Sequence, residues 1–190
     1  MSKGRLEAFS DGVMAIILTI MVLELKVPED GTLEALVPLL PKFLSYVLSF
    51  VFLGIYWNNH HHLWQGANSV NGAILWANMH LLFWLSLIPF TTAWMGEHFG
   101  AIPVAVYGAV LWLSGVAYYF LVRAMLAHHG EGSLLASAIG NNRKEMASLF
   151  IYTAAIPLAF VAAWIAAALY VLVAVIWLIP DRRIESVMVK

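Results

Sequence analysis

Charged and hydroxyl-bearing side chains lie close together near the start of the chain, directly before an uncharged stretch. Arg5, Glu7 and Asp11 fall within two turns of a helix, and Ser10 adds a hydroxyl beside them. The stretch that follows, residues 12–23, contains no charged side chain. A charged group at membrane depth is costly, so an acid in such a position is a functional candidate. Asp11 is therefore the first candidate, and a plain interface residue or an ion pair with a basic side chain is the alternative.

The stretch after Asp11 carries a periodic pattern. Gly12, Ile16, Ile20 and Leu23 recur at intervals of four, four and three residues, which places them on one face of a helix. Thr19 lies beside this stripe. A stripe of this kind is usually a packing face, and in a membrane protein it can equally face lipid. A pore-lining role is the third interpretation, and spacing alone does not choose among the three.

The histidines suggest metal binding only weakly. His60, His61 and His62 are consecutive, so on a helix they point about 100° apart and cannot all face one ion. Two of them could bind a divalent cation across subunits, but aromatic packing and hydrogen bonding at the membrane interface are favoured. His128 and His129 are expected in a solvated polar loop. We predict no metal site.

The composition of the whole chain defines the setting of these residues. Of 190 residues, 62% are hydrophobic and only 11% are charged, and the mean hydropathy is +0.83. Soluble domains are about half apolar and about a quarter charged. The net charge of −1 and the lack of a basic stripe argue against a nucleic-acid partner. We expect one all-α integral membrane domain over residues 1–190 rather than a soluble enzyme.

Spans of about 20 apolar residues fit the hydrocarbon core of a bilayer. The run 146–179 is uncharged and too long for one span, and Pro157 with the small residues near Ala162 predicts a hairpin within it. The first helix reaches across the bilayer only when counted from Arg5 to Lys26. We predict six transmembrane helices, over residues 5–26, 35–59, 71–95, 102–126, 144–160 and 164–180.

The basic residues predict the orientation of these helices. With the N-terminus inside, the outer side carries only Lys26 and Lys42. Such a bias follows the positive-inside rule and supports an even number of spans. We therefore expect a multi-pass protein of the cell inner (plasma) membrane with both termini cytoplasmic. The inner side carries Lys3, Arg5, Arg123, Arg143, Lys144, Arg182, Arg183 and Lys190.

A motif at the start of the first helix resembles that of a known family. Residues 5–11 have the form R-x-x-x-F-S-D, the signature of the transmembrane-protein-175 family, which comprises endolysosomal potassium channels and their bacterial relatives. Residues 56–64 resemble the aromatic, His-rich second helix of that family. The likeness covers essentially the whole chain. Further similar positions in the third helix are Trp76, Asn78, His80 and residues 87–90.

This resemblance implies an assembly and a pore. Animal members carry two six-helix repeats and form dimers, whereas bacterial members carry one repeat and form tetramers. The present chain carries one, so the resemblance implies a homotetramer in the lipid bilayer with the first helix lining a central pore. It implies that Ile16 forms the constriction, that Ile20 and Leu23 also line the pore, and that Thr19 lies near the filter.

Such a pore differs from the usual potassium filter. The sequence contains no T-V-G-Y-G segment, so no ring of backbone carbonyls replaces the hydration shell of the ion. Four Ile16 side chains instead form an apolar collar, and the cost of dehydration favours potassium over sodium. No bound cofactor is expected besides the permeant potassium ion. The motif and its expected polar partners form a network that positions the first helix: Arg5, Phe9, Ser10, Asp11, Trp57, His61 and Asn78.

Three other classes of function remain to be weighed. A proton-conducting pore or proton-coupled transporter would use Asp11 with His61 or His80 as relay groups. A membrane enzyme would need paired acids and a histidine at catalytic spacing, and the sequence offers no such cluster, so we predict that the protein is not an enzyme. A scaffold without a pore is the third alternative.

Overall fold

The computed structural model describes residues 2–130 and 143–178, and these residues form helices and connections without any strand. The expected all-α fold class is confirmed. A short 3-10 helix, η1, precedes the second long helix. The elements are α1 (Lys3–Leu23), η1 (Glu34–Leu39), α2 (Leu40–Gln65), α3 (Gly72–Ser86), α4 (Ile88–Glu97), α5 (Ala101–His129), α7 (Arg143–Leu158) and α8 (Ala163–Leu178).

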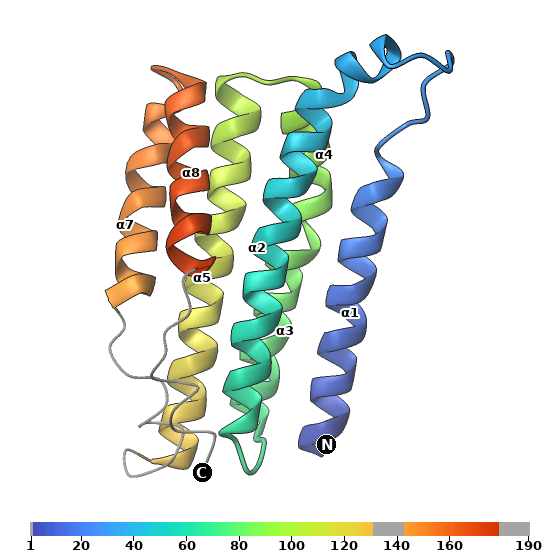
Figure 1. The fold of residues 1–190 in the computed structure, drawn as a ribbon. Helices are drawn as coiled ribbons and strands as arrows, with labels where there is room; N and C mark the ends of the chain where they lie inside the picture. Colours follow the sequence, from blue (N-terminus) through green and yellow to red (C-terminus); the bar gives the residue numbers. More distant parts are fainter. Residues whose placement is uncertain (1, 131–142, 179–190) are drawn as a thin grey trace.

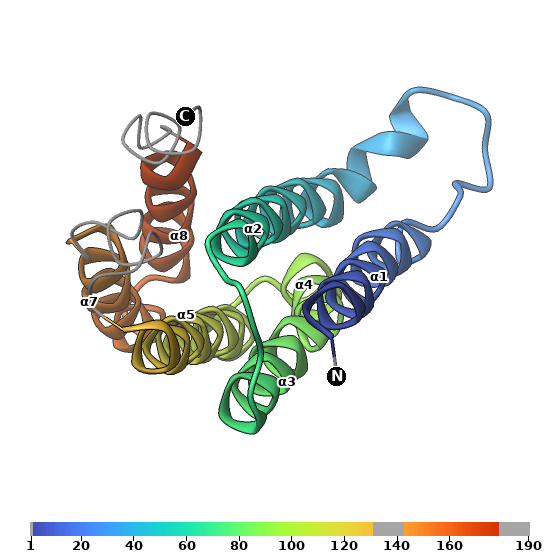
Figure 2. The same ribbon diagram turned by 90° about the horizontal axis from the view of Figure 1, so that it is seen from below.

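The long helices run side by side as a bundle, with α1 at one edge and α7 and α8 at the opposite edge (Figures 1 and 2). Four segments are long and apolar enough to cross a membrane: 3–23, 34–65, 72–97 and 101–129. The helix α8 is apolar but shorter. Residues 179–180, the end of the sixth predicted span, and the basic residues Arg182, Arg183 and Lys190 lie outside the described residues.

The third membrane segment is broken into α3 and α4. The break falls at Leu87, and Pro89 lies in the first turn of α4. Proline lacks a backbone N–H and its ring clashes with the preceding turn, so it is favoured at the start of a helix rather than within one. The Thr92 hydroxyl donates to the Ile88 carbonyl at 2.6 Å and satisfies an acceptor next to the break. A proline near the far end of the uncharged run 74–95 indicates a kink here from the sequence alone.

The last two helices reverse direction over residues 159–162. The Ala162 N–H donates to the Leu158 carbonyl at 2.8 Å and closes the end of α7. This is the part of the uncharged run in which a hairpin was expected. The two helices then pack against each other and against α5 (Figure 2).

Close backbone contacts and buried hydroxyls join the helices away from α1. A Cβ atom on Gly108 of α5 would lie 1.9 Å from the Tyr170 hydroxyl of α8, so any larger residue there would force the buried Tyr170 ring to move. Ser49 Oγ lies 2.7 Å from Thr92 Oγ1 and 2.9 Å from the Tyr107 hydroxyl, which connects α2, α4 and α5. Small residues and interhelical hydrogen bonds of this kind hold membrane helices together because lipid supplies no hydrophobic driving force between them. These contacts make a firm scaffold beside α1.

Candidate functional site

The helix α1 has two different faces. One face packs against the rest of the chain, and its residues recur every three or four positions, as 3.6 residues per turn require. A single buried stripe shows that the bundle covers α1 from one side only. The buried residues are Leu6, Ser10, Met14, Ile17 and Met21.

The opposite face of α1 is apolar and largely uncovered by the other described residues. Ile16 is 58% exposed, Ile20 is 44% exposed and Leu23 is 76% exposed. Gly12 is exposed on the same face. All four positions of the stripe identified in the sequence therefore point away from the protein core, toward lipid, another chain or a pore.

The Thr19 side chain is exposed beside this stripe. Its hydroxyl donates to the carbonyls of Ala15 at 3.1 Å and Ile16 at 3.0 Å, within its own helix. A hydroxyl has one proton and two acceptor lone pairs. Because the backbone takes the proton, the oxygen of Thr19 is left to accept, which is the property that a cation ligand needs.

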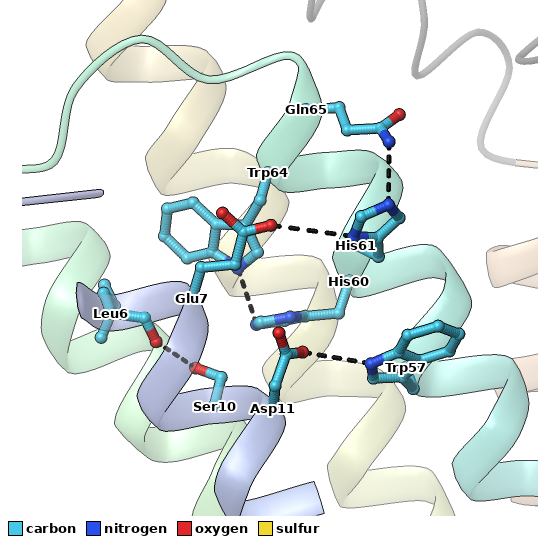
Figure 3. A network of polar contacts seen from close by, with 9 residues as sticks. All are labelled: Leu6, Glu7, Ser10, Asp11, Trp57, His60, His61, Trp64 and Gln65. Carbon is cyan, nitrogen blue, oxygen red and sulfur yellow. Dashed lines mark hydrogen bonds and ion pairs between the residues drawn. The ribbon is translucent and has the colours of Figure 1, made fainter. Parts of the chain in front are cut away.

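At the N-terminal end of α1, a buried chain of hydrogen bonds joins this helix to α3 and α2. Ser10 donates to the Leu6 carbonyl at 2.8 Å (Figure 3) and accepts from Asn78 Nδ2 at 2.9 Å. Asn78 Oδ1 lies 2.8 Å from His60 Nε2, and Trp64 Nε1 also lies 2.8 Å from that nitrogen. Ser10, Asn78, His60 and Trp64 are all buried. Asn78 and Ser10 satisfy each other and so join α3 to α1. His60 is only partly satisfied, because a single nitrogen, Nε2, faces both the Trp64 N–H and the Asn78 oxygen, and its Nδ1 has no hydrogen-bond partner among the described residues.

A second, more exposed set of contacts lies one turn away (Figure 3). Trp57 Nε1 donates to Asp11 Oδ1 at 3.1 Å, and the Trp57 ring stacks on His61 with centroids 5.8 Å apart. His61 Nδ1 lies 3.7 Å from Glu7 Oε1, and its Nε2 lies 2.8 Å from Gln65 Nε2. Asp11 is thus held by an indole N–H and not by a basic side chain.

Five of the seven residues of the expected network come together at this end: Ser10, Asp11, Trp57, His61 and Asn78. Arg5 and Phe9 do not take part. Arg5 is exposed and forms no hydrogen bond or ion pair with any residue in the described ranges, and Phe9 is 50% exposed. The reason is helical geometry, because Arg5 and Phe9 lie on the same face as Ile16.

Sequence reasoning missed His60 as a member of the network. The buried positions of α2 include 49, 52, 53, 60, 63 and 64, a helical repeat that selects His60 from the three consecutive histidines. His60 is 1% exposed, whereas His61 lies at the surface of the bundle. The repeat was visible in the sequence, but which face of α2 is buried was not.

The described residues contain neither a cluster of metal ligands nor a chain of hydrogen bonds that joins the histidines of α2 and α3 to Asp11 over a long distance. Across the described ranges, no group of three or more His, Cys, Asp or Glu side chains is placed to hold a metal ion. His80 Nε2 accepts from Trp84 Nε1 of its own helix at 2.9 Å. No hydrogen bond in the part of the chain that the structure describes links His80 to Asp11 or His61.

A groove of about 650 Å³ runs along the outer half of α1, between this helix and α4. It lies next to the exposed stripe, because Ile16 and Ile20 form one of its walls and Phe90 and Trp94 form the other. Glu24 and Glu97 lie at its polar end. An apolar groove beside an uncovered apolar helix is a surface suited to another helix.

An all-helical bundle with several membrane-length segments and one half-covered helix defines the class of multi-pass membrane proteins. Residues 5–89 match the family described as endosomal/lysosomal potassium channel TMEM175. The chain is 56% identical over 187 residues to "Potassium channel HX13_20290" of Chryseobacterium sp. (strain P1-3). The aligned residues make up 98% of this chain and 97% of the relative. The chain belongs to the TMEM175 family, as its motif suggested.

Solved and animal relatives extend this comparison. The fold matches the crystal structure of "a lysosomal potassium-selective channel TMEM175 homolog" from Chamaesiphon minutus, with a TM-score of 0.80, 27% identity and coverage of 92% of this chain and 95% of that one. A mouse relative named "Endosomal/lysosomal proton channel TMEM175" is 29% identical over 181 residues, 85% of this chain but 36% of the relative. The family is one of ion channels, so the prediction that the protein is not an enzyme is confirmed.

Proposed function

We propose that this protein is a potassium channel in which α1 lines the pore and Ile16 forms its narrowest part. The observation that carries the proposal is the two-faced character of α1. One face is buried in the bundle, and the other presents Ile16, at 58% exposure, with no cover from its own chain. The names of the bacterial relatives at 56% and 34% identity support potassium as the ion.

A pore of this kind needs several copies of α1 around an axis, because a single exposed stripe encloses nothing. We infer a homotetramer, in line with the single set of helices in the chain. Closed cyclic symmetry then places equivalent Ile16 side chains at one level. We infer a plasma-membrane protein with both termini in the cytoplasm, and the positive-inside bias supports that orientation. Under this topology the network at the inner end of α1 lies on the cytoplasmic side.

Selection in such a pore depends on dehydration. An apolar ring either dewets and closes or admits an ion that has lost part of its water. Potassium holds its water less tightly than sodium, so the ring admits potassium more readily. Thr19, whose oxygen is left to accept, lies one turn along α1 from Ile16 and supplies a ligand for the partly dehydrated ion.

The network at the inner end of α1 has a positioning role in this proposal. Ser10 and Asp11 do not share the face of Ile16, and they bond to α3 and α2 respectively. They fix the rotation of α1 about its axis, and that rotation decides which residues face the ions. No ion-binding ring at Asp11 is required.

Proton conduction is the second candidate, and the name of the mouse relative favours it. Against it stands the contact of Asp11 with Trp57, an N–H donor that does not pass on protons. Reversal potentials in proteoliposomes separate the two candidates. A potassium channel follows the potassium gradient at constant pH, whereas a proton pathway shifts its reversal potential when one side is acidified at constant potassium.

The decisive experiment is a polar substitution at the proposed constriction. Ile16→Asn replaces the apolar ring with hydrogen-bonding groups, and planar-bilayer recordings should show a conductance about tenfold higher, as for a barrier lowered by about 1.4 kcal/mol. The potassium-to-sodium permeability ratio should fall at the same time. Val22→Asn is the matched control, since Val22 is also exposed on α1 but lies about 120° around the helix from Ile16.

Unchanged conductance together with an unchanged permeability ratio in Ile16→Asn would remove Ile16 from the ion path. An equal effect in Val22→Asn would show that the response comes from polarity anywhere on α1 rather than from the stripe.

A further inference from the structure

The connection between α2 and α3 is bound by two consecutive histidines from another helix. His128 and His129 end α5, and their rings contact Asn68, Ser69 and Asn71. The expected loop at His128 and His129 is wrong, because α5 continues through both residues, whereas the expected exposure to solvent holds for His128. Figure 1 shows this end of α5, the α2–α3 connection and the N-terminus of α1 at the same end of the bundle.

The bonds of His129 fix its protonation state. Its Nε2 receives the backbone N–H groups of Asn68 at 3.1 Å and Ser69 at 3.4 Å, so this nitrogen must be an acceptor. Its Nδ1 lies 2.9 Å from the Met125 carbonyl, which only accepts, so this nitrogen must carry the proton. His129 is therefore neutral, with its proton on Nδ1.

The bonds of His128 fix the opposite tautomer. Asn71 Oδ1 caps α3 by accepting from the Ile74 N–H at 2.9 Å, which identifies its other side-chain atom as the amide nitrogen. That Nδ2 donates to His128 Nδ1 at 3.2 Å. His128 Nε2, 2.9 Å from Ser69 Oγ, must then carry the proton. His128 is neutral as well, with its proton on Nε2.

Each ring thus uses its unprotonated nitrogen, Nε2 in His129 and Nδ1 in His128, to accept hydrogen bonds from the loop. Adding a proton to His129 sets a new N–H against two backbone N–H groups, and adding one to His128 sets a new N–H against the Asn71 amide. The two rings have centroids 5.0 Å apart, so two added charges would also repel each other. Protonation of either ring therefore opposes docking of the loop.

No acid among the described residues forms an ion pair with His128 or His129. The loop itself, residues 66–71, contains no titratable side chain. On α5 the preceding charged residue is the exposed Arg123, and α3 brings His80 against Phe120. The helix α7, which packs on α5, begins with Arg143, Lys144 and Glu145, and Glu145 lies beside Tyr118, about 15 Å along α5 from His128. On α2, His61 pairs with Glu7 and Gln65, and His62 forms no hydrogen bond with His128 or His129 within the described ranges.

We propose that His128 and His129 form a proton-sensitive latch that ties the end of α5 to the α2–α3 connection. Histidine changes charge between about pH 5 and 8. The latch needs neutral rings, so its stabilising bonds are present at neutral and alkaline pH and are lost as the pH falls. The loop it holds joins α2 and α3, which carry Trp57 and Asn78, the residues that bond to α1. Acidification at this face therefore weakens the support of the inner end of α1.

Hydrogen–deuterium exchange of the full-length protein tests the latch without relying on ion conduction. Protection of the peptide covering residues 66–71, corrected for the intrinsic pH dependence of exchange, should fall about tenfold between pH 7.5 and 5.5, which corresponds to about 1.4 kcal/mol. The double substitution His128→Phe/His129→Phe should give low protection at both pH values. His98→Phe, at the end of α4, is the control and should behave like the parent protein.

Nitrogen-15 NMR of histidine side chains gives a second readout. His129 should show the Nδ1–H tautomer and His128 the Nε2–H tautomer at pH 7.5. Protection that does not change with pH in the parent protein, protection that survives the double substitution, a pH response lost in His98→Phe, or the reverse tautomers would each overturn the proposal.

Discussion

The N-terminal end and the C-terminal half of α1 are built on different principles. At the N-terminal end, Ser10 and Asp11 form directed hydrogen bonds with α3 and α2. From Gly12 to Leu23, no side-chain hydrogen bond to another helix is present within the described residues, and the exposed face is apolar. Directed bonds fix position and rotation, whereas an apolar stripe is non-directional and adapts to what covers it. The helix α1 is therefore anchored to the bundle at one end, and the apolar face along the rest of it is free to line a pore or to contact another chain.

The largest loss of stability is expected when a buried hydrogen bond at the N-terminal end of α1 is removed. Asn78→Leu deletes the partner of Ser10 and leaves His60 without its amide oxygen, in a site that is 0% exposed at Asn78. We expect a loss of about 2 kcal/mol in the free energy of unfolding, because buried polar groups then lack partners. Unfolding of the purified protein in detergent measures it.

Asn59→Leu is the control for this substitution. Asn59 lies on α2, one residue before His60, and its amide donates only to the Ile55 carbonyl of the same helix. An equal loss in both variants would show that the chain from Ser10 to His60 has no special role in anchoring α1.

A smaller effect is expected from the second, more exposed contact. Trp57→Phe removes the N–H that donates to Asp11 and keeps an aromatic ring against His61. The expected loss is about 1 kcal/mol, the usual net value of one hydrogen bond. The same unfolding assay checks it, and a loss larger than that of Asn78→Leu would reverse the proposed ranking of the two contacts.

The smallest effect on stability is expected in the exposed stripe. Ile20→Ala shortens a side chain that is 44% exposed and lies outside the buried stripe of α1. We expect a change within about 0.5 kcal/mol for the unfolding of the isolated chain, as at other surface positions. A loss as large as that of Asn78→Leu would mean that this face already packs within one chain and is not available to line a pore.

The sequence predicted more of the fold than of the contacts. The kink at Pro89 and the reversal near Ala162 follow from local rules, since proline and small residues act within one or two turns. The network joins residues distant in the chain, such as Ser10 with Asn78 and Asp11 with Trp57. The family motif pointed to those partners, but it also suggested Arg5, whose side chain faces away from them. Periodicity defines the faces of a helix and does not say which face receives a neighbour.

The sequence by itself determined that this protein is apolar enough for a membrane, that its helices are of membrane length, and that α1 has one continuous apolar stripe. These properties depend on composition and on the 3.6-residue repeat, which are local. Only the tertiary structure decided that the stripe is uncovered, that His60 is the buried member of its histidine run, and that His128 and His129 bind the α2–α3 connection. Each of those outcomes requires two distant segments to meet, and the packing of whole helices against one another decides which segments do so.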